Sequence, residues 1–359
     1  MSRAALAKRV AELANAGAYE PAARAQGTTA RLDTNENLVI PSATVGAAIA
    51  AARRAVDVRE YPDGGAGRLA GAIARHIGVP PRCVVVGSGS DQILDLAVSH
   101  LVPRRARVLV TDPTFSFLEA RLALHGMAAR RVPFGRDMTV DMGALEEAAR
   151  GADAIYIDSP NNPTGFQFPE RRLRRLIRSF DGLVIIDEAY AAFARYSLAT
   201  MARSQENLAV VGTLSKSFGL AGLRVGYAAM PPAMAGAFAS AVQYPYPISS
   251  VSIEAAIASL REGGVAAMRE AAAAVMTERE RLVRGLSAHA NIEAFPSQAN
   301  FVLFDAGDSH RQVHRALAEQ GISVRLLGRV GGRTGCLRAT VGTREQNSRL
   351  LMAIGDLMG

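Results

Sequence analysis

Lys216 is the residue of this sequence whose chemistry most needs an explanation. Of the 41 Lys and Arg residues only two, Lys8 and Lys216, are lysines, so arginine supplies positive charge nearly everywhere else. Arginine stays protonated and is a poor nucleophile, whereas a lysine with a lowered pKa can form a Schiff base with a carbonyl compound. Lys8 lies in an Ala-rich segment typical of a solvated helix face, whereas Lys216 follows the apolar run 208–212 and precedes a Gly-rich segment. We therefore expect Lys216 to be a reactive amine rather than a surface lysine on a loop.

Three further polar segments follow short apolar stretches: Gly87–Asp91 after residues 84–86, Asp158–Gly165 after residues 154–157, and Asp187–Tyr190 after residues 183–186. Glycines before a helix N-terminus form a cradle for phosphate, although a tight turn with a serine cap would explain the first segment equally well. The second segment presents asparagines on a proline-stiffened loop. An acid at the end of a buried strand, as in the third, is costly unless it meets a cation. With Lys216, the four segments offer an anion cradle, an amide, a carboxylate with a phenol, and an amine.

The elements that must position these groups are visible as an alternation of apolar strands with helices. Strands are predicted at residues 84–86, 107–110, 154–157, 183–186, 208–211 and 225–229, with helices at 92–101, 117–125 and 170–179 among the connections. Apolar strands without polar alternation indicate a largely parallel sheet covered on both faces. Ligands of such sheets bind beyond the carboxyl ends of the strands, so the four polar segments are expected to converge there.

This alternation stops after about residue 230. A long helical stretch over 252–288, interrupted at Gly263-Gly264, leads into a smaller α+β region. Ahead of the alternation, a short helix in the first 19 residues precedes a polar, turn-prone segment at 31–37. We therefore predict an α/β protein with three parts: an N-terminal arm over residues 1–40, a large domain over 41–245, and a connecting helix with a small C-terminal domain over 246–359.

Composition narrows the class of protein further. The 359 residues carry a net charge of +8, but the arginines are spread along the chain and interleaved with acids, which favours a solvated surface over nucleic-acid binding. Two cysteines, Cys83 and Cys336, form neither a disulfide framework nor a metal-ligand pattern, and no apolar run reaches the length of a membrane helix. The first residues show helical spacing rather than a signal-peptide core. The sequence therefore predicts a cytoplasmic protein that binds no membrane.

Pyridoxal 5′-phosphate has the groups that such a site would bind: a phosphate, a carbonyl, a cationic ring nitrogen and a ring oxygen. The segments Ser159–Gly165, Asp187–Tyr190 and Ser215–Arg224, in this order, resemble the motifs of the fold-type-I pyridoxal-phosphate aminotransferases. The segments 35–37, 61–63 and 335–343 are similar to those of the histidinol-phosphate aminotransferases within that group. The resemblance spans nearly the whole chain. It implies the type I transferase fold, a large domain with a mostly parallel sheet plus a smaller α+β domain.

The resemblance also implies roles for individual residues. Lys216 would form the Schiff base and then move a proton, Asp187 would pair with the ring nitrogen, and Tyr190 would bond the ring oxygen together with Asn162. The phosphate would be held by Gly89, Ser90, Asp91, Ser215 and Arg224, with Thr213 as a weaker candidate. Phe115 would stack on the ring, unless it is an ordinary core aromatic. Tyr61 would reach the phosphate of a neighbouring subunit, which implies a homodimer with shared active sites.

Substrate recognition is implied less directly. Arg338 fits the arginine that binds the acidic group of the substrate, and Arg325 fits a second cationic position for a phosphate-bearing substrate. Asn300 resembles a residue of the pocket floor, with a purely structural role equally open, and Tyr19 resembles a tyrosine that closes over the substrate from the partner subunit. The favoured reaction is transamination between the amino donor histidinol phosphate and the 2-oxo acid acceptor 2-oxoglutarate.

Other functions stay open at this point. Segments 38–41 and 64–67 depart from the family pattern at the substrate entrance, so an aromatic or other amino acid could be the donor, and decarboxylation of phosphothreonine is a further alternative on this fold. A cofactor-binding regulator would need a DNA-binding module, for which we expect no room before Tyr19. His310 and His314 stand four apart on a predicted helix, but no third ligand is near them, so no metal site is predicted. The arginines of residues 171–178 are expected to form a solvated helix flank.

Overall fold

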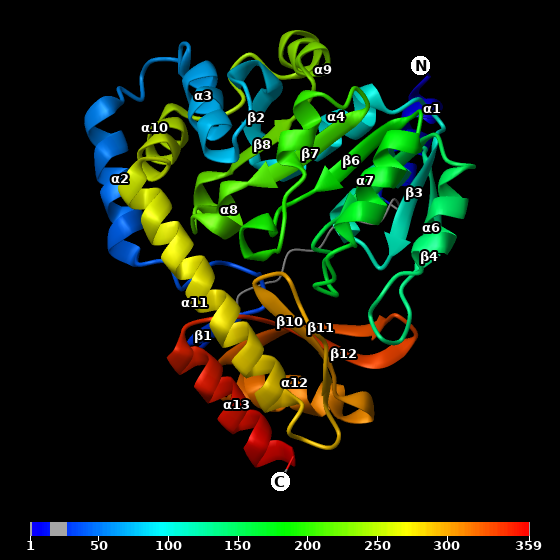
Figure 1. The fold of residues 1–359 in the computed structure, drawn as a ribbon, viewed down its shortest axis with the longest axis vertical. Helices are drawn as coiled ribbons and strands as arrows, with labels where there is room; N and C mark the ends of the chain where they lie inside the picture. Colours follow the sequence, from blue (N-terminus) through cyan, green and yellow to red (C-terminus); the bar gives the residue numbers. More distant parts are fainter. Residues whose placement is uncertain (1, 15–26, 359) are drawn as a thin grey trace.

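The computed structural model describes residues 2–14 and 27–358, which form two sheets with helices around them (Figure 1). The seven-stranded sheet has the order β2 (Val84–Ser88), β8 (Val225–Ala229), β7 (Leu208–Thr213), β6 (Leu183–Asp187), β5 (Ala154–Asp158), β3 (Arg107–Asp112) and β4 (Ala128–Pro133). Strand β8 runs antiparallel to both its neighbours, and the other neighbouring pairs are parallel. The predicted α/β class with a mostly parallel sheet is confirmed, and residues 225–229 form a strand as predicted, the one that runs against its neighbours in this sheet.

Alternate residues of the central strands face two separate apolar layers. On one face, Ile155, Ile157 and Ile186 pack against α6 (Met142–Ala149) and α7 (Glu170–Ser179). On the other, Tyr156 and Ile185 pack against α4 (Gly89–Leu101) and α5 (Ser116–Leu124). Because both faces are covered, every residue of β5 and β7 is buried, which explains why these strands are apolar up to their last residues, Asp158 and Thr213.

Edge strand β4 was missed by the sequence prediction. Its segment Ala128-Ala129-Arg130-Arg131-Val132 carries two arginines and buries only Val132. Charged side chains are a common protection of a sheet edge, where one side of the backbone has no partner strand. The pattern that identifies a central strand is therefore absent at this position.

Helices α2 (Ser42–Ala55), α3 (Gly65–Ile77) and α10 (Ser250–Ser259) cover the β2 end of the large sheet, and the long helix α11 (Glu262–Leu286) runs from there to the second sheet (Figure 1). The break in the helical stretch lies at residues 260–261, just before the predicted Gly263-Gly264, and both glycines belong to the first turn of α11. A Cβ at Gly264 would lie 2.1 Å from the Ser259 carbonyl oxygen. Glycine therefore allows one helix to begin against the end of the other.

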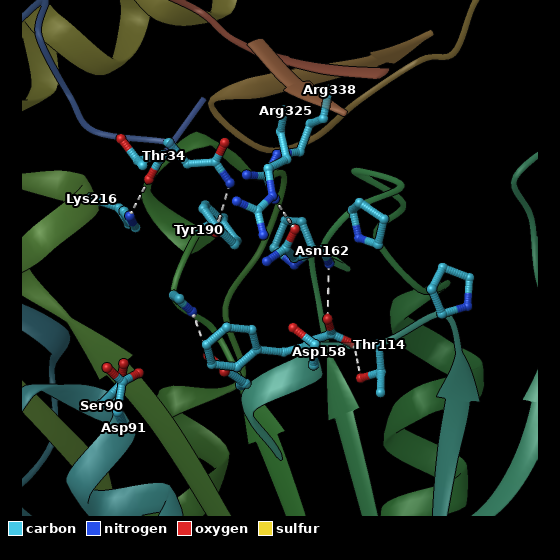
Figure 2. Close-up of a pocket in the computed structure, with 18 of the residues that line it drawn as sticks. Thr34, Ser90, Asp91, Thr114, Asp158, Asn162, Tyr190, Lys216, Arg325 and Arg338 are labelled. Atoms are coloured by element: carbon cyan, nitrogen blue, oxygen red, sulfur yellow. Dashed lines mark hydrogen bonds between the residues drawn. The ribbon is translucent and has the colours of Figure 1, made fainter. Parts of the chain in front are cut away.

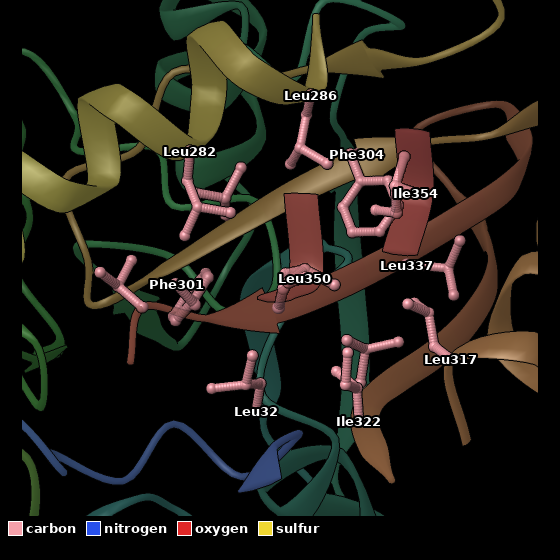
Figure 3. Packing of buried hydrophobic residues seen from close by; sticks show 14 of the residues in the cluster. Leu32, Leu282, Leu286, Phe301, Phe304, Leu317, Ile322, Leu337, Leu350 and Ile354 are labelled. Atoms are coloured by element: carbon pink, nitrogen blue, oxygen red, sulfur yellow. The ribbon is translucent and has the colours of Figure 1, made fainter. Parts of the chain in front are cut away.

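The second sheet has the order β1 (Ala30–Leu32), β11 (Ile322–Val330), β12 (Arg333–Thr340), β10 (Phe301–Asp305) and β9 (Glu293–Ala294). It packs against α11, α12 (His310–Glu319) and α13 (Arg344–Met358). Figure 3 shows Leu282 and Leu286 of α11 above Phe301 and Phe304 of β10. Strand β1 corrects the expectation that residues 31–37 form only a turn, since Ala30 and Leu32 are buried in this core. The division at residues 40 and 245 stays a prediction.

The remaining predictions concern the start of the chain, membranes and metals. Helix α1 spans Arg3–Ala14, and the rest of the first predicted helix, with Tyr19, lies outside the described residues. No helix in residues 2–14 and 27–358 is both long and apolar enough to cross a membrane. Within the same ranges, no group of three or more His, Cys, Asp and Glu side chains could hold a metal ion.

Candidate active site

A cavity of about 450 Å³ lies at the carboxyl ends of β3, β5, β6 and β7, where the second sheet faces the first. Figure 2 shows Arg325 and Arg338 entering it from the side of the second sheet, opposite Asp158 and Thr114 of the large sheet. Most of the predicted site residues line this one space: Ser90, Asp91, Phe115, Asn162, Asp187, Tyr190, Ser215, Lys216, Arg224, Arg325 and Arg338. The convergence expected from the strand ends is therefore present in the structure.

Lys216 lies on the one-turn helix α8 (Leu214–Ser217), directly after β7. Thr213 caps this helix, since its hydroxyl oxygen accepts a hydrogen bond of 3.1 Å from the Ser215 amide. The Lys216 ammonium donates to the carbonyl oxygen of Thr34 at 2.9 Å (Figure 2). Burial, and next the charge of Arg338, lower the pKa of Lys216 to about 8. Near neutral pH the unprotonated fraction of this amine is therefore much larger than that of an exposed lysine, which favours its action as a nucleophile.

Asp187 ends β6 with a buried carboxyl group. It accepts hydrogen bonds of 3.0 Å from the Tyr156 hydroxyl and from the Ala189 amide. Burial raises the pKa of Asp187 to about 6, although both hydrogen bonds act in the opposite direction. Within residues 2–14 and 27–358 no Lys, Arg or His forms an ion pair with it. A cationic group of a ligand would therefore be stabilised at this carboxylate.

Asp158 is a second buried carboxyl group that the sequence analysis did not single out. It lies directly opposite Asp187 in the register of β5 and β6. It accepts bonds from the Thr114 hydroxyl at 3.0 Å, the Asn161 side chain at 2.9 Å and the Asn162 amide at 2.9 Å. Burial raises the pKa of Asp158 to about 7, and the charge of Asp187 adds to the shift. Asp158 therefore ties the loop after β3 to the loop that presents Asn162.

Tyr190 and Asn162 face the cavity from neighbouring strand ends. The Tyr190 hydroxyl oxygen accepts a bond of 3.0 Å from the Asn35 side chain, and burial raises the pKa of Tyr190 to about 12. The Asn162 side-chain oxygen accepts a bond from Arg338, which also donates to the Asp33 carbonyl oxygen at 2.8 Å. The sequence identified Asn35 only as part of a segment similar to the family, without a role in the site. Its hydrogen bond to Tyr190 is visible only in the structure.

The predicted anion cradle is built by two glycines and an arginine. Gly89 has a φ of +78°, and a Cβ there would lie 2.4 Å from the Arg224 guanidinium. A Cβ at Gly226 would lie 2.2 Å from the Ser90 amide nitrogen, so glycine is required at both positions. Arg224 also pairs with Asp91 at 2.9 Å. The alternative of a serine cap is not seen, because the Ser88 side chain caps no backbone group of α4.

Four predicted residues lie elsewhere or only beside the cavity. Gly89 shapes the cradle but does not line the cavity. Asn300 is buried behind the wall, where its side-chain nitrogen donates to the Asn35 carbonyl oxygen at 3.0 Å. Tyr61 is 76% exposed and stacks on Tyr246 with ring centroids 4.6 Å apart, beside a separate cavity of about 200 Å³. Tyr19 lies outside the described residues, so its role and that of Tyr61 across an interface stay predictions.

The donor set fits pyridoxal 5′-phosphate on several independent grounds. The Gly89 amide donates to the Arg224 carbonyl oxygen at 3.0 Å, and the following amides belong to the first turn of α4, which has no intrahelical acceptor for them and can therefore bind an anion. Lys216 supplies an amine of lowered pKa, and Asp187 supplies a carboxylate without a cationic partner among the described residues. The Thr34 hydroxyl at the cavity wall is buried and has no hydrogen-bond partner in the structure. The cavity therefore offers complementary groups for phosphate, carbonyl and ring nitrogen.

Comparison with known proteins gives concordant matches. Residues 29–354 match the model of the family "Aminotransferase class I and II". The chain is 34% identical over 336 residues to a histidinol-phosphate aminotransferase from Desulfitobacterium hafniense, covering 91% of both chains. It is 36% identical to one from Roseiflexus castenholzii, covering 91% of this chain and 89% of the relative.

The fold comparison agrees. The crystal structure of histidinol-phosphate aminotransferase from Sinorhizobium meliloti in complex with pyridoxal 5′-phosphate aligns with a TM-score of 0.83 and 26% identity, covering 96% of each chain.

Proposed function

The chain belongs to the class I and II aminotransferases, and from this premise we propose that it transfers the amino group of histidinol phosphate to 2-oxoglutarate with pyridoxal 5′-phosphate as cofactor. One observation carries the assignment of the site. Lys216, whose pKa is lowered to about 8, shares one cavity with Arg325, Arg338 and the carboxyl group of Asp187. Among the described residues no cationic side chain forms an ion pair with this carboxyl group. This is the set that a transaminase needs.

When bound, the cofactor supplies a carbonyl that condenses with amines and a ring that accepts electrons. In the proposed mechanism Lys216 first supplies the amine that holds the cofactor and then acts as the base that moves a proton at the substrate carbon. Asp187 would keep a proton on the ring nitrogen by its negative charge, and the pKa of Asp187 would fall in the presence of that cation. Tyr190 and Asn162 would donate to the ring oxygen and so orient the ring.

Substrate binding falls to the two arginines of the second sheet. Arg325 and Arg338 lie on β11 and β12 and are partners in the register of these strands, so their guanidinium groups enter the cavity together. Planar forked donors bind phosphate and carboxylate equally well, so one pair of side chains can serve both histidinol phosphate and 2-oxoglutarate in turn. The names of the relatives, at 34–36% identity, support this donor over the alternatives.

The proposal includes a homodimer with shared active sites in the cytoplasm. Tyr61 supports the dimer, because a side chain 76% exposed is available to a second copy. Cys83 and Cys336 are buried free thiols, which suits a reducing compartment. The variants Tyr61→Ala and Lys216→Ala, each expected to be inactive alone, test the shared site when they are mixed. Hybrid dimers recover activity if each site uses Tyr61 of one copy and Lys216 of the other.

Half-reactions with a panel of amino donors test the reaction itself. The protein is loaded with pyridoxal 5′-phosphate, and loss of the cofactor's visible absorption band is followed after addition of histidinol phosphate, phenylalanine, phosphothreonine or glutamate. Histidinol phosphate and glutamate are expected to react. Reaction with phenylalanine alone would move the assignment to an aromatic donor, and release of carbon dioxide from phosphothreonine would make the protein a decarboxylase.

Lysine variants complete this test. Lys216→Ala should abolish both the band and the reaction. Lys8→Ala, which removes the other, exposed lysine, is the matched control and should change neither.

A further inference from the structure

Residues 33–35, between β1 and α2, contact three functional groups of the cavity. The Asp33 carbonyl oxygen accepts from Arg338 at 2.8 Å, and the Thr34 carbonyl oxygen accepts from Lys216 at 2.9 Å. The Asn35 side-chain nitrogen donates to the Tyr190 hydroxyl at 3.0 Å. Three consecutive residues thus set the positions of an arginine, an amine and a phenol. Of these three contacts, only that of Asn35 is made by a side chain, so only it can be removed by substitution.

Asn35 is held more firmly than its loop position would suggest. It is 2% exposed and has a φ of +54°, in the left-handed region that asparagine tolerates better than most residues. Its amide nitrogen donates to the Thr340 hydroxyl at 2.9 Å, and its carbonyl oxygen accepts from the Asn300 side chain at 3.0 Å. Residues at the ends of β10 and β12 therefore fix its backbone on both sides.

The positions of the oxygen and the nitrogen in the Asn35 side-chain amide follow from the groups next to them. The Thr340 hydroxyl lies 3.4 Å from the side-chain oxygen, which leaves the nitrogen to donate to Tyr190. A phenol has one proton, and its oxygen can accept a bond while that proton is donated elsewhere. Because the Tyr190 oxygen already accepts from Asn35, its own O–H is left to point into the cavity.

We propose that Asn35 is a positioning residue that acts through Tyr190: it holds the phenol by one hydrogen bond and directs the phenol's own proton toward the ring oxygen of the cofactor. This inference rests on the proposed function, in which Tyr190 donates to that oxygen. It also gives Asn300 a task different from substrate contact, because Asn300 and Thr340 hold Asn35 in place.

A double-mutant cycle between positions 35 and 190 tests this proposal. Asn35→Asp keeps the shape and the tolerance of positive φ but replaces the donor by an acceptor, so the Tyr190 proton would turn away from the cavity. The dissociation constant of pyridoxal 5′-phosphate is measured by titration of the cofactor-free protein, together with the pH midpoint of the bound cofactor's visible band. We expect Asn35→Asp to weaken binding about ten-fold, the loss of roughly one hydrogen bond, and to shift the midpoint.

In the Tyr190→Phe background the same substitution should weaken binding by less than about two-fold, because the hydroxyl through which it acts is gone. Effects that multiply in the double variant would overturn the proposal and make Asn35 a general support of the loop. Asn35→Gly, which also tolerates the positive φ, provides the same cycle if Asn35→Asp does not fold.

Asn37→Asp is the matched control. Asn37 is buried in the same segment, and its side-chain nitrogen donates to the Ser217 carbonyl oxygen at 3.0 Å rather than to Tyr190. Its effect on the dissociation constant should therefore be independent of the Tyr190→Phe substitution, so that the two fold-changes multiply in the double variant. If they do not multiply, the cycle does not isolate the contact of Asn35. Failure of the unmodified chain to bind pyridoxal 5′-phosphate would overturn the proposed function and this inference with it.

Discussion

The cofactor-free protein should lose stability as the pH rises from about 4.5 to 7. Three carboxyl groups at the ends of β5 and β6 cause this: burial raises the pKa of Asp158 to about 7, of Asp187 to about 6 and of Glu188 to about 7. An acid with a raised pKa binds its proton more tightly in the folded state than in the unfolded chain. The folded state therefore holds more protons in this range, and stability falls with rising pH until the folded pKa is passed.

The magnitude follows from the number of protons involved. Each group contributes up to about 1.4 kcal/mol per pH unit between its unfolded and folded pKa. Because the three carboxyls interact, their combined contribution is on the order of several kcal/mol rather than a simple multiple. His76 acts in the opposite direction, since burial lowers its pKa and stability then rises with pH up to about 6.5. One histidine cannot offset three acids over the whole range.

Thermal unfolding of the cofactor-free protein at pH 5, 6, 7 and 8 measures this dependence. Glu188→Gln should reduce the slope of stability against pH by about one proton. Among the described residues this carboxyl accepts from the Ser197 hydroxyl and the Leu198 amide, and it does not line the cavity. Pyridoxal 5′-phosphate should flatten it as well, since a ring cation at Asp187 lowers the pKa of that group. A midpoint temperature of thermal unfolding that rises steadily from pH 5 to pH 7 would refute the reasoning.

Three further outcomes are expected at the cavity. Lys216→Arg keeps the charge but loses the amine, so transamination should fall at least about a thousand-fold, measured as the half-reaction with glutamate. Gly89→Ala places a methyl group 2.4 Å from Arg224 at a φ of +78°, so affinity for pyridoxal 5′-phosphate should fall at least about ten-fold in equilibrium titration, and unchanged affinity would exclude the cradle. Arg338→Met removes a charge that lowers the pKa of Lys216, so this pKa should rise from about 8. Carbon-13 NMR of labelled lysine can follow it, because the chain has only two lysines, and an unchanged pKa would contradict the coupling.

The sequence predicts the large sheet and its four polar strand ends well because each signal is local. An apolar strand followed by Asp187, or by the loop that contains Asn162, can be recognised without knowing which distant residues lie next to it. Edge strand β4 was not predicted because its two arginines hide the strand pattern. Strand β8 was predicted with its observed bounds, but its antiparallel orientation is decided by its partner strands rather than by its composition. Asp158 escaped for another reason: a carboxylate inside a turn-forming segment is ordinary until the structure shows three donors around it.

Local patterns identified Arg338 as a site residue, but they do not reveal how the second sheet changes the pKa and hydrogen bonding of Lys216. Arg338 comes from β12, and Thr34 is held next to Asn35, which Asn300 and Thr340 anchor to β10 and β12. Arg338 lowers the pKa of Lys216 by its charge, whereas the Thr34 carbonyl oxygen stabilises the ammonium form by a hydrogen bond. Both groups are attached to the second sheet, whereas Lys216 directly follows β7 of the first. The reactivity of the amine is therefore a property of the contact between the two sheets, so a substitution that shifts this contact should change the pKa of Lys216 without touching any residue next to it in the chain.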